Sequence, residues 1–351
     1  MTSKAKNVNG YAPNWENIAS LIDDGYIRVG EHPENSELLI YNYTQKTQYD
    51  QKWTKDTLLC RGLISKNRSV VSRPFQKFFN YSEFDASHAN VLKGPWNVFE
   101  KMDGSLGILY EFADGDYRIA TRGAFASEQA LWGTAWLKKN HPNFQPAKGE
   151  TWLFEIIYPT NRIVVDYGDK EGLVLLDVLD SDTGHRMEPD KNHPFEVCDY
   201  HGLSETIPSG ERDNCEGYVI VNSKGFRVKI KHEEYVRLHK IITGCSNRTV
   251  WEYLKDGKPF DELLSNVPDE FYSWLEKTRE SLLENYSEVE DSARNYFNER
   301  PADVDRKELA KYFTEYDHPF LCFLMLDDKD YSEKIWKMIK PERALPFIEE
   351  V

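Results

Sequence analysis

The spacing of hydrophobic residues changes near residue 232 of this 351-residue chain. Before that point, short runs rich in β-branched and aromatic residues alternate with turn signals such as Asp-Gly at 114–115, and each run predicts a strand. The expected strands cover 38–44, 70–79, 96–102, 106–112, 117–122, 152–158, 162–167, 172–180, 216–222 and 226–231. Residues 126–140 instead predict a helix that begins at Ser127 and carries Leu131, Trp132, Trp136 and Leu137 on one face.

After residue 232, apolar residues recur every three or four positions, which is the period of a helix. The runs HEEYVRLHKII, TVWEYLKDG and RKELAKYFTEY show it clearly. We therefore predict an α+β protein with two domains. Antiparallel sheets are expected in residues 1–240, and an all-helical C-terminal domain is expected in residues 241–351.

Composition narrows the class of protein. No run approaches the ~18 apolar residues of a membrane span, and the first fifteen residues lack the apolar core of a signal peptide. Five scattered cysteines fit neither a disulfide framework nor a zinc site. These features predict a monomeric cytoplasmic protein with reduced thiols and no membrane partner.

Charge is unevenly distributed along the chain. The net charge is −15. Residues 241–351 carry −10 of it, which leaves −5 for residues 1–240. Within residues 52–77, however, seven basic side chains stand against one acid, Asp56. Such a segment is either a local phosphate-binding patch or a solvated basic face, and composition does not decide between them.

The segment FEKMDGSLG, residues 99–107, places Lys101 directly after an apolar strand, with Asp103 and Gly104 behind it. A solvated strand end explains this pattern as well as a nucleophilic lysine does. Roughly one chain in ten or twenty of this length contains K-x-D-G by chance. Other residues in the sequence must therefore distinguish between these two interpretations of Lys101.

Residues suited to nucleotidyl transfer lie on other expected strands. A lysine that attacks the α-phosphate of a nucleotide needs nearby cations, and a divalent metal needs oxygen ligands. Glu155 and Glu216 offer oxygens, and Lys229 and Lys231 alternate onto one face of a strand. Taken singly, each of these residues could equally face solvent. Asp177 is expected to face solvent, with support of the site as the alternative.

The order of these motifs is more specific than any one of them. K-x-D-G, an F-E strand, E-G-Y-V-I and then K-I-K follow one another as in covalent nucleotidyltransferases. Over residues 36–240 the chain resembles the phage RNA ligase 1 family. The matching segments are YNYTQ, LLCRGLI, SRPFQKFFNYSE, EKMDGSLGILY, TRGAFASEQAL, FEIIYPTNRIVVDY, EGYVIV and FRVKIKHEEYVRLH. This resemblance implies ATP-grasp-like antiparallel sheets in the catalytic domain.

The resemblance also implies roles for individual residues. Lys101 would carry AMP, Glu155 would contact the ribose, and Glu155 and Glu216 would hold Mg²⁺ or Mn²⁺. Nucleotide-binding roles would fall to Tyr41, Arg61, Lys77, Glu100, Asp103, Gly104, Arg122, Lys229 and Lys231. Phe79 and Tyr235 match a family aromatic and a family tyrosine. Arg122 departs from the lysine that the family usually has there, so its contact is expected to differ.

The implied activity is ATP-dependent sealing of RNA 5′-phosphate and 3′-hydroxyl ends through Lys101-AMP and adenylylated RNA. A helical C-terminal domain favours tRNA as the substrate, in the host cytoplasm if the chain is phage-encoded. Two alternatives remain. A DNA ligase or capping enzyme would typically carry an OB barrel after the K-I-K strand, and a non-catalytic nucleic-acid-binding module would have lost key lysine or acidic positions.

Overall fold

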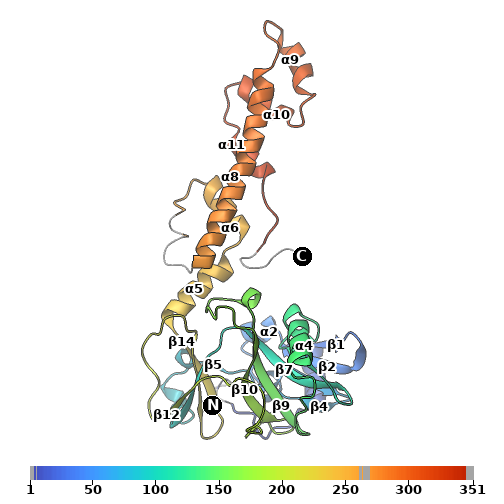
Figure 1. Cartoon of the computed structure of the whole chain (residues 1–351), viewed down its shortest axis with the longest axis vertical. Helices are drawn as coiled ribbons and strands as arrows, with labels where there is room; N and C mark the ends of the chain where they lie inside the picture. The colour runs from blue at the N-terminus through green and yellow to red at the C-terminus, as the bar shows by residue number, and fades with distance from the viewer. Residues whose placement is uncertain (1–3, 5, 261–262, 264–268, 345–351) are drawn as a thin grey trace. The chain divides into compact units, whose positions relative to one another are not determined.

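The computed structural model describes residues 4, 6–260, 263 and 269–344. The chain divides into two compact units, and the division falls between Val236 and Arg237 (Figure 1). The first unit contains β-sheets and the second contains helices, so the predicted α+β class is confirmed.

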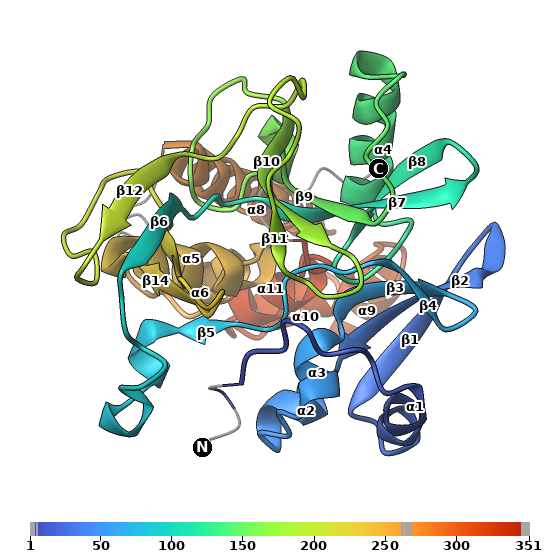
Figure 2. The same ribbon diagram turned by 90° about the horizontal axis from the view of Figure 1, so that it is seen from below.

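Three sheets build the first unit (Figure 2). The first sheet has the order β1-β2-β3-β4, the second β11-β10-β9-β7-β8, and the third β12-β6-β13-β14-β5. Every neighbouring pair is antiparallel except β14 with β5. The strands are β1 (Ile27–His32), β2 (Asn35–Tyr43), β3 (Arg61–Lys66), β4 (Ser69–Ser72), β5 (Phe79–Asn80), β6 (Trp96–Glu100), β7 (Ser105–Ala113), β8 (Asp116–Thr121), β9 (Glu150–Ile157), β10 (Gly172–Asp180), β11 (Arg186–Met187), β12 (Tyr200–Ser204), β13 (Gly217–Asn222) and β14 (Arg227–Lys231).

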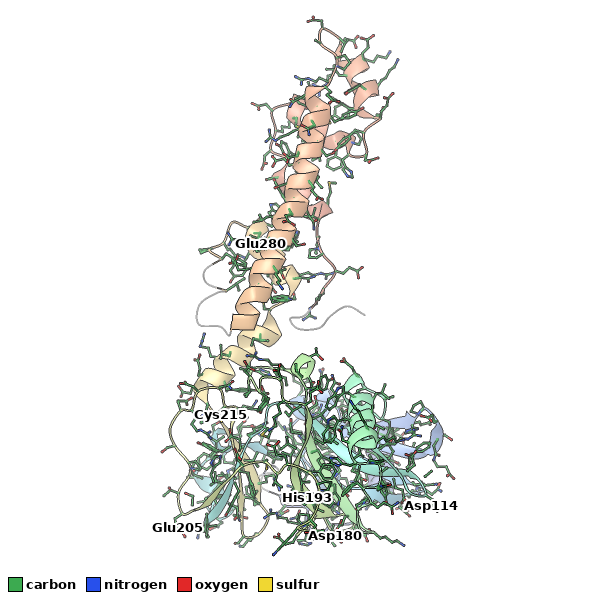
Figure 3. The ribbon with its side chains drawn as sticks, in the orientation of Figure 1. Asp114, Asp180, His193, Glu205, Cys215 and Glu280 are labelled. Carbon is green, nitrogen blue, oxygen red and sulfur yellow. The ribbon has the colours of Figure 1, made fainter. Side chains whose placement is uncertain are left out.

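Helices α1 (Trp15–Asp23), α2 (Gln45–Tyr49), α3 (Lys55–Leu59) and α4 (Glu128–Asn140) complete the first unit. Helix α4 begins after Ser127, whose side chain caps it as predicted. It lies beside the second sheet (Figure 2), where Leu137 packs in one cluster with Trp152 and Phe154. Asp114 and Asp180 lie at the turns that follow β7 and β10 (Figure 3).

Strand β10 is buried on both faces, which explains why its sequence is apolar on both sides of Asp177. Leu173 and Leu175 pack in the cluster under α4, whereas Val174 packs on the other side with Met102 and Ile157. The second sheet is therefore the middle layer of the first unit.

Two expected strands are wrong. Residues 162–167 form no strand, because the N–H groups of Val164 and Val165 donate to the carboxylate of Asp103 and not to a neighbouring strand. The expected strand over 70–79 is broken after Ser72. There Arg73 is buried, and its guanidinium donates to the carbonyls of Val8, Tyr11 and Asp182, which ties the N-terminal segment to the β10–β11 turn.

The helical pattern after residue 232 is confirmed. Helix α5 (Glu233–Gly244) runs across the division between the units. The second unit then contains α6 (Asn247–Lys255), α8 (Asp269–Asn298), α9 (Arg306–Phe313), α10 (Pro319–Leu326) and α11 (Ser332–Met338). Its core joins Ala293 of α8, Leu321 of α10 and Ile335 of α11. In the described part of the chain, no helix has the length and apolarity that a membrane crossing requires.

Candidate active site

Lys101 lies where the chain leaves the third sheet for the second. Strand β6 ends at Glu100 and β7 begins at Ser105, so residues 101–104 cross between the sheets. The N–H of Lys101 donates to the carbonyl of Gly217, and its Nζ lies 2.7 Å from Oε2 of Glu216. The ammonium group is thus fixed at the junction of two sheets, with its side chain one-fifth exposed (20%).

Glu216 bridges two lysines. Its buried carboxylate binds Lys101 through Oε2 and Lys231 of β14 through Oε1, at 2.7 and 2.8 Å. Gly217 follows with φ of +138°, where a Cβ would lie 2.0 Å from the carbonyl oxygen of Ile230. The E-G pair of the motif therefore has a steric basis, because β14 approaches β13 too closely here for any side chain.

The side chain of Asp103 points away from Lys101 and is fully occupied. One carboxylate oxygen accepts the N–H groups of Val164 and Val165, and the other accepts the hydroxyl of Tyr235 at 2.7 Å. Its own N–H donates to the Tyr167 hydroxyl. Burial raises the pKa of Asp103, and these bonds oppose the rise. Asp103 and Tyr235 therefore fix the loop that carries Lys101.

Glu155, on β9, faces this loop. Its Oε1 accepts the N–H of Gly104 at 3.0 Å, and a Cβ on Gly104 would lie 2.6 Å from the Ile156 carbonyl oxygen. Burial raises the pKa of Glu155 to about 8, and the nearby Lys101 opposes this rise. The carboxyl group is therefore mostly protonated at neutral pH in the free protein, so it can both donate and accept hydrogen bonds.

A cavity of about 440 Å³ lies beside Lys101 and Glu155. Its walls come from all three sheets and the segments between them. They include Arg61, Phe75, Phe78, Phe99, Lys101, Gly104, Arg122, Glu155, Val219 and Arg227. Aromatic and aliphatic walls with a few convergent charges are typical of a small-molecule site.

Partly buried cations lie at or near this cavity, and Arg61 lines it. The Nη1 atom of Arg61 is buried without a hydrogen-bond partner among the described residues, and burial lowers the pKa of Arg61. Burial also lowers the pKa of Lys77. Burial, with Lys77, Lys101 and Lys231 nearby, lowers the pKa of Lys229 to about 7. Like charges at close range are stabilised by an anion, so this cluster is suited to a polyphosphate.

The other basic residues of 52–77 do not join this cluster. Arg73 is bound to carbonyls, and Lys66 pairs with Glu37 at 3.3 Å. Of the basic segment, Arg61 therefore lines the cavity and Lys77 lies near Arg61, and no single basic face results among the residues that the structure describes.

Three expected nucleotide or phosphate contacts need revision. Tyr41 packs in the core against Trp15. Tyr43 lies at the site instead: its hydroxyl accepts a bond from Arg122, and its ring lies 5.7 Å from Nζ of Lys77. Both tyrosines belong to the same core cluster, and Tyr43 in addition contacts the cations of the site. The sequence YNY contained Tyr43, but nothing in it distinguished the two tyrosines.

The carboxylate of Glu100 is engaged elsewhere. It binds His201 and Arg212, each at 2.7 Å, and accepts a bond from the Cys215 thiol. Phe79 packs on Trp53 in the core, with Nζ of Lys77 5.0 Å from its ring. Glu100 lines the cavity, although its carboxylate already has three partners. Phe79 supports its neighbour Lys77 from the core, and a nucleotide contact of either residue stays a prediction.

Metal binding was expected at Glu155 and Glu216. Across the described ranges, no group of three His, Cys, Asp or Glu side chains could hold an ion. Glu216 is bound to two lysines, and Glu155 is mostly neutral. Mg²⁺ commonly takes one or two carboxylates plus substrate phosphates. A metal that arrives with a nucleotide would therefore bind here only if Glu216 releases a lysine and Glu155 releases its proton.

The raised pKa of Glu155 predicts a pH-dependent stability. A carboxyl group that binds its proton more tightly when folded stabilises the fold at low pH, and this contribution is lost as pH rises from about 4.5 to about 8. Glu155→Gln should remove this decline, which amounts to roughly 1 kcal/mol per pH unit at its steepest. Urea unfolding at pH 5 and pH 8 measures it. Glu171→Gln, at an exposed position before β10, is the control, and equal slopes in all three proteins would contradict the prediction.

The chain is similar to several proteins that are named RNA ligases. It is 31% identical over 250 residues to a candidate RNA ligase of Thermovibrio ammonificans, and the match covers 64% of each chain. It is 22% identical to the RNA ligase of Rhodothermus phage RM378, with 88% of each chain covered. A solved Naegleria gruberi RNA ligase with ATP and Mn is 19% identical, covers 42% of this chain and 53% of its own, and has a TM-score of 0.34.

The matched region coincides with the site. The chain spans slightly less than two thirds of the Thermovibrio protein's length. The sequence profile described as RNA ligase matches residues 59–235, which run from the strand of Arg61 to Tyr235 on α5. The chain therefore belongs to the RNA ligase family, and its resemblance to phage RNA ligase 1 is confirmed.

Proposed function

We propose that this chain is an ATP-dependent RNA ligase that joins a 5′-phosphate end to a 3′-hydroxyl end. One observation carries the proposal: Glu216 fixes Nζ of Lys101 beside a cavity. Partly buried cations at or near this cavity, Arg61 and Lys229 among them, would be stabilised by a bound anion. A nucleophile, a nucleoside-sized cavity and charges for a triphosphate are thus present in one place.

In the first step, Nζ of Lys101 attacks the α-phosphorus of ATP. A P–N bond forms, the P–O bond to pyrophosphate breaks, and Lys101 gives up a proton. Glu216 keeps Nζ in position, and Lys231 stays beside it through the same carboxylate. Lys229 takes up a proton as the phosphates approach, because an adjacent anion favours its charged form. Lys229, Lys231, Lys77 and Arg61 then offset the negative charge that develops on the leaving pyrophosphate.

In the second step, a 5′-phosphate oxygen of the RNA attacks the phosphorus of the bound AMP and frees Lys101. In the third, a 3′-hydroxyl attacks the adenylylated 5′-phosphate, a phosphodiester bond forms, and AMP leaves. A magnesium ion, held by Glu216 and by the deprotonated form of Glu155 with the phosphates, would supply further charge neutralisation. While Glu155 keeps its proton, its carboxyl group is suited to a ribose hydroxyl instead.

The alternatives have less support. A DNA ligase or capping enzyme would be expected to continue into a barrel, whereas the described chain after β14 is helical. A non-catalytic binder would not need a lysine held at a cavity mouth. We further propose tRNA as the RNA, a monomeric cytoplasmic enzyme, and substrate selection by the helical unit.

Lys101→Ala should reduce protein–AMP formation and overall ligation below detection, because the nucleophile is lost. Joining of RNA that is supplied already adenylylated should persist in part, since that step needs no new nucleophile. Incubation with radiolabelled ATP, followed by a denaturing gel, measures the first effect. Lys139→Ala, at an exposed position on α4, is the matched control. A normal protein–AMP band from Lys101→Ala would disprove the assignment.

Removal of divalent metal should stop the reaction. EDTA should abolish protein–AMP formation, and Mg²⁺ or Mn²⁺ should restore it, because the available ligands are oxygens. Zinc alone should not restore it, because zinc prefers cysteine and histidine ligands and the two expected ligands, Glu155 and Glu216, are carboxylates. Activity that persists in EDTA would count against a metal-dependent site.

A chain truncated near residue 245 should still form Lys101-AMP. It retains Tyr235 and every cavity residue, and all of them precede Arg237. It should lose its preference for cleaved tRNA over a generic linear RNA, because the helical unit is removed. Ligation rates on both RNAs, compared with those of the full chain, test this division. An unchanged preference would place specificity in the first unit.

A further inference from the structure

Asp177 contradicts the expectation that it faces solvent. It is 6% exposed and lies on β10, where the register with β9 shifts between Leu175 and Asp177. Its carboxylate binds two arginines. Oδ1 lies 2.8 Å from Nε of Arg186, and Oδ2 lies 2.9 Å from Nη2 of Arg227. A buried carboxylate with two cationic partners is a specific arrangement that the reaction steps above do not use.

The two arginines differ in position. Arg186 belongs to β11, the neighbour of β10 in the second sheet, and half of its side chain is exposed (49%). Arg227 begins β14 in the third sheet, and 14% of its side chain is exposed. The pair of Asp177 with Arg227 therefore connects the second and third sheets, whereas the pair with Arg186 stays within one sheet.

Arg227 is part of a partition between two cavities. Its guanidinium carbon lies 3.9 Å from the centre of the Phe75 ring. Arg227, Phe75 and Phe99 line the cavity beside Lys101, and they also line a second cavity of about 430 Å³. Asp177 lines the second cavity. It thus reaches Arg227 from the side opposite the candidate nucleotide site.

Arg227 and the reacting lysine line the same cavity. Lys231, bound to Glu216 beside Lys101, is four residues along β14 from Arg227. At about 3.3 Å per residue, this separation is about 13 Å along the strand. With the α-phosphate at Lys101, the nucleoside part of ATP would extend toward the Arg227 end of the cavity.

We propose that Asp177 is a positioning residue, which holds Arg227 as the inner wall of the nucleotide cavity and so closes the nucleoside end. This inference rests on the proposed function. Without its partner, Arg227 would be a buried charge without compensation, which is strongly unfavourable. The guanidinium would turn toward solvent, the partition with Phe75 would open, and water would enter from the second cavity.

Loss of the Asp177 carboxylate should weaken ATP binding more than it slows the chemical step. Asp177→Asn should raise the KM for ATP in protein–AMP formation by about tenfold, the size expected for one charged hydrogen bond. The kcat should change much less, because Lys101, Glu216 and Lys231 stay in place. Arg186→Gln is the matched control, since it removes the other partner of the same carboxylate. It should leave KM close to that of the wild type.

A double variant separates positioning from general damage. Asp177→Asn with Arg227→Gln leaves neither member of this buried pair charged, so its thermal stability should exceed the value expected from adding the two single effects. Asp177→Glu keeps the charge and should restore part of the ATP affinity. An unchanged KM in Asp177→Asn would overturn the proposal, as would a fall in kcat alone that matches a lower folded fraction.

Hydrogen exchange tests the same contact without any reaction. In the protein without ATP, Asp177→Asn should speed amide exchange in β14 more than Arg186→Gln does. Equal exchange in the two variants would show that Asp177 does not hold β14. If the wild-type protein forms no AMP adduct, the proposed function fails, and the exchange comparison still decides whether the contact between the sheets operates.

Discussion

The carboxylate of Glu216 between Lys101 and Lys231 is the interaction on which the site depends. It joins the end of β6 to the end of β14. It also lies next to Gly217, where strands β13 and β14 approach too closely for a side chain. Removal of this buried carboxylate would leave two ammonium groups close together with Lys229 nearby. The cation cluster is tolerable in the free protein because one acid is shared and one lysine, with a pKa of about 7, is partly neutral.

A second constraint acts on the backbone of the lysine loop. Residues 101–104 leave one sheet and enter another, so no strand pairing holds them along their length. Asp103 takes over this function by binding two backbone N–H groups and one hydroxyl. The motif K-x-D-G therefore divides its tasks: the lysine faces the cavity, the aspartate organises the loop behind it, and the glycine allows Glu155 and Ile156 to approach.

Patterns in the sequence predicted local elements well and tertiary partners poorly. Helix α4 and the strands β13 and β14 followed from period and residue type. The segment RIVVDY has the composition of a strand, but it forms none because Asp103, sixty residues earlier, takes its N–H groups. The placement of Asp177 was missed for a similar reason: a register shift in β10 accompanies it, and no local pattern records such a shift. Tyr43 was missed because its partners Arg122 and Lys77 are distant in the sequence. The family resemblance supplied Lys101 and Glu216, which periodicity alone left undecided.

Tyr235 gives the reactive loop a mechanical connection. It is the third residue of α5, and the same helix continues to Gly244, past the point where the second unit begins. The Tyr235 hydroxyl binds Asp103, so the first turn of α5 is linked directly to the backbone beside Lys101. The loop that carries the nucleophile is therefore fixed by a residue 132 positions later in the chain, and its geometry forms only after the sheets and the first turn of α5 have come together.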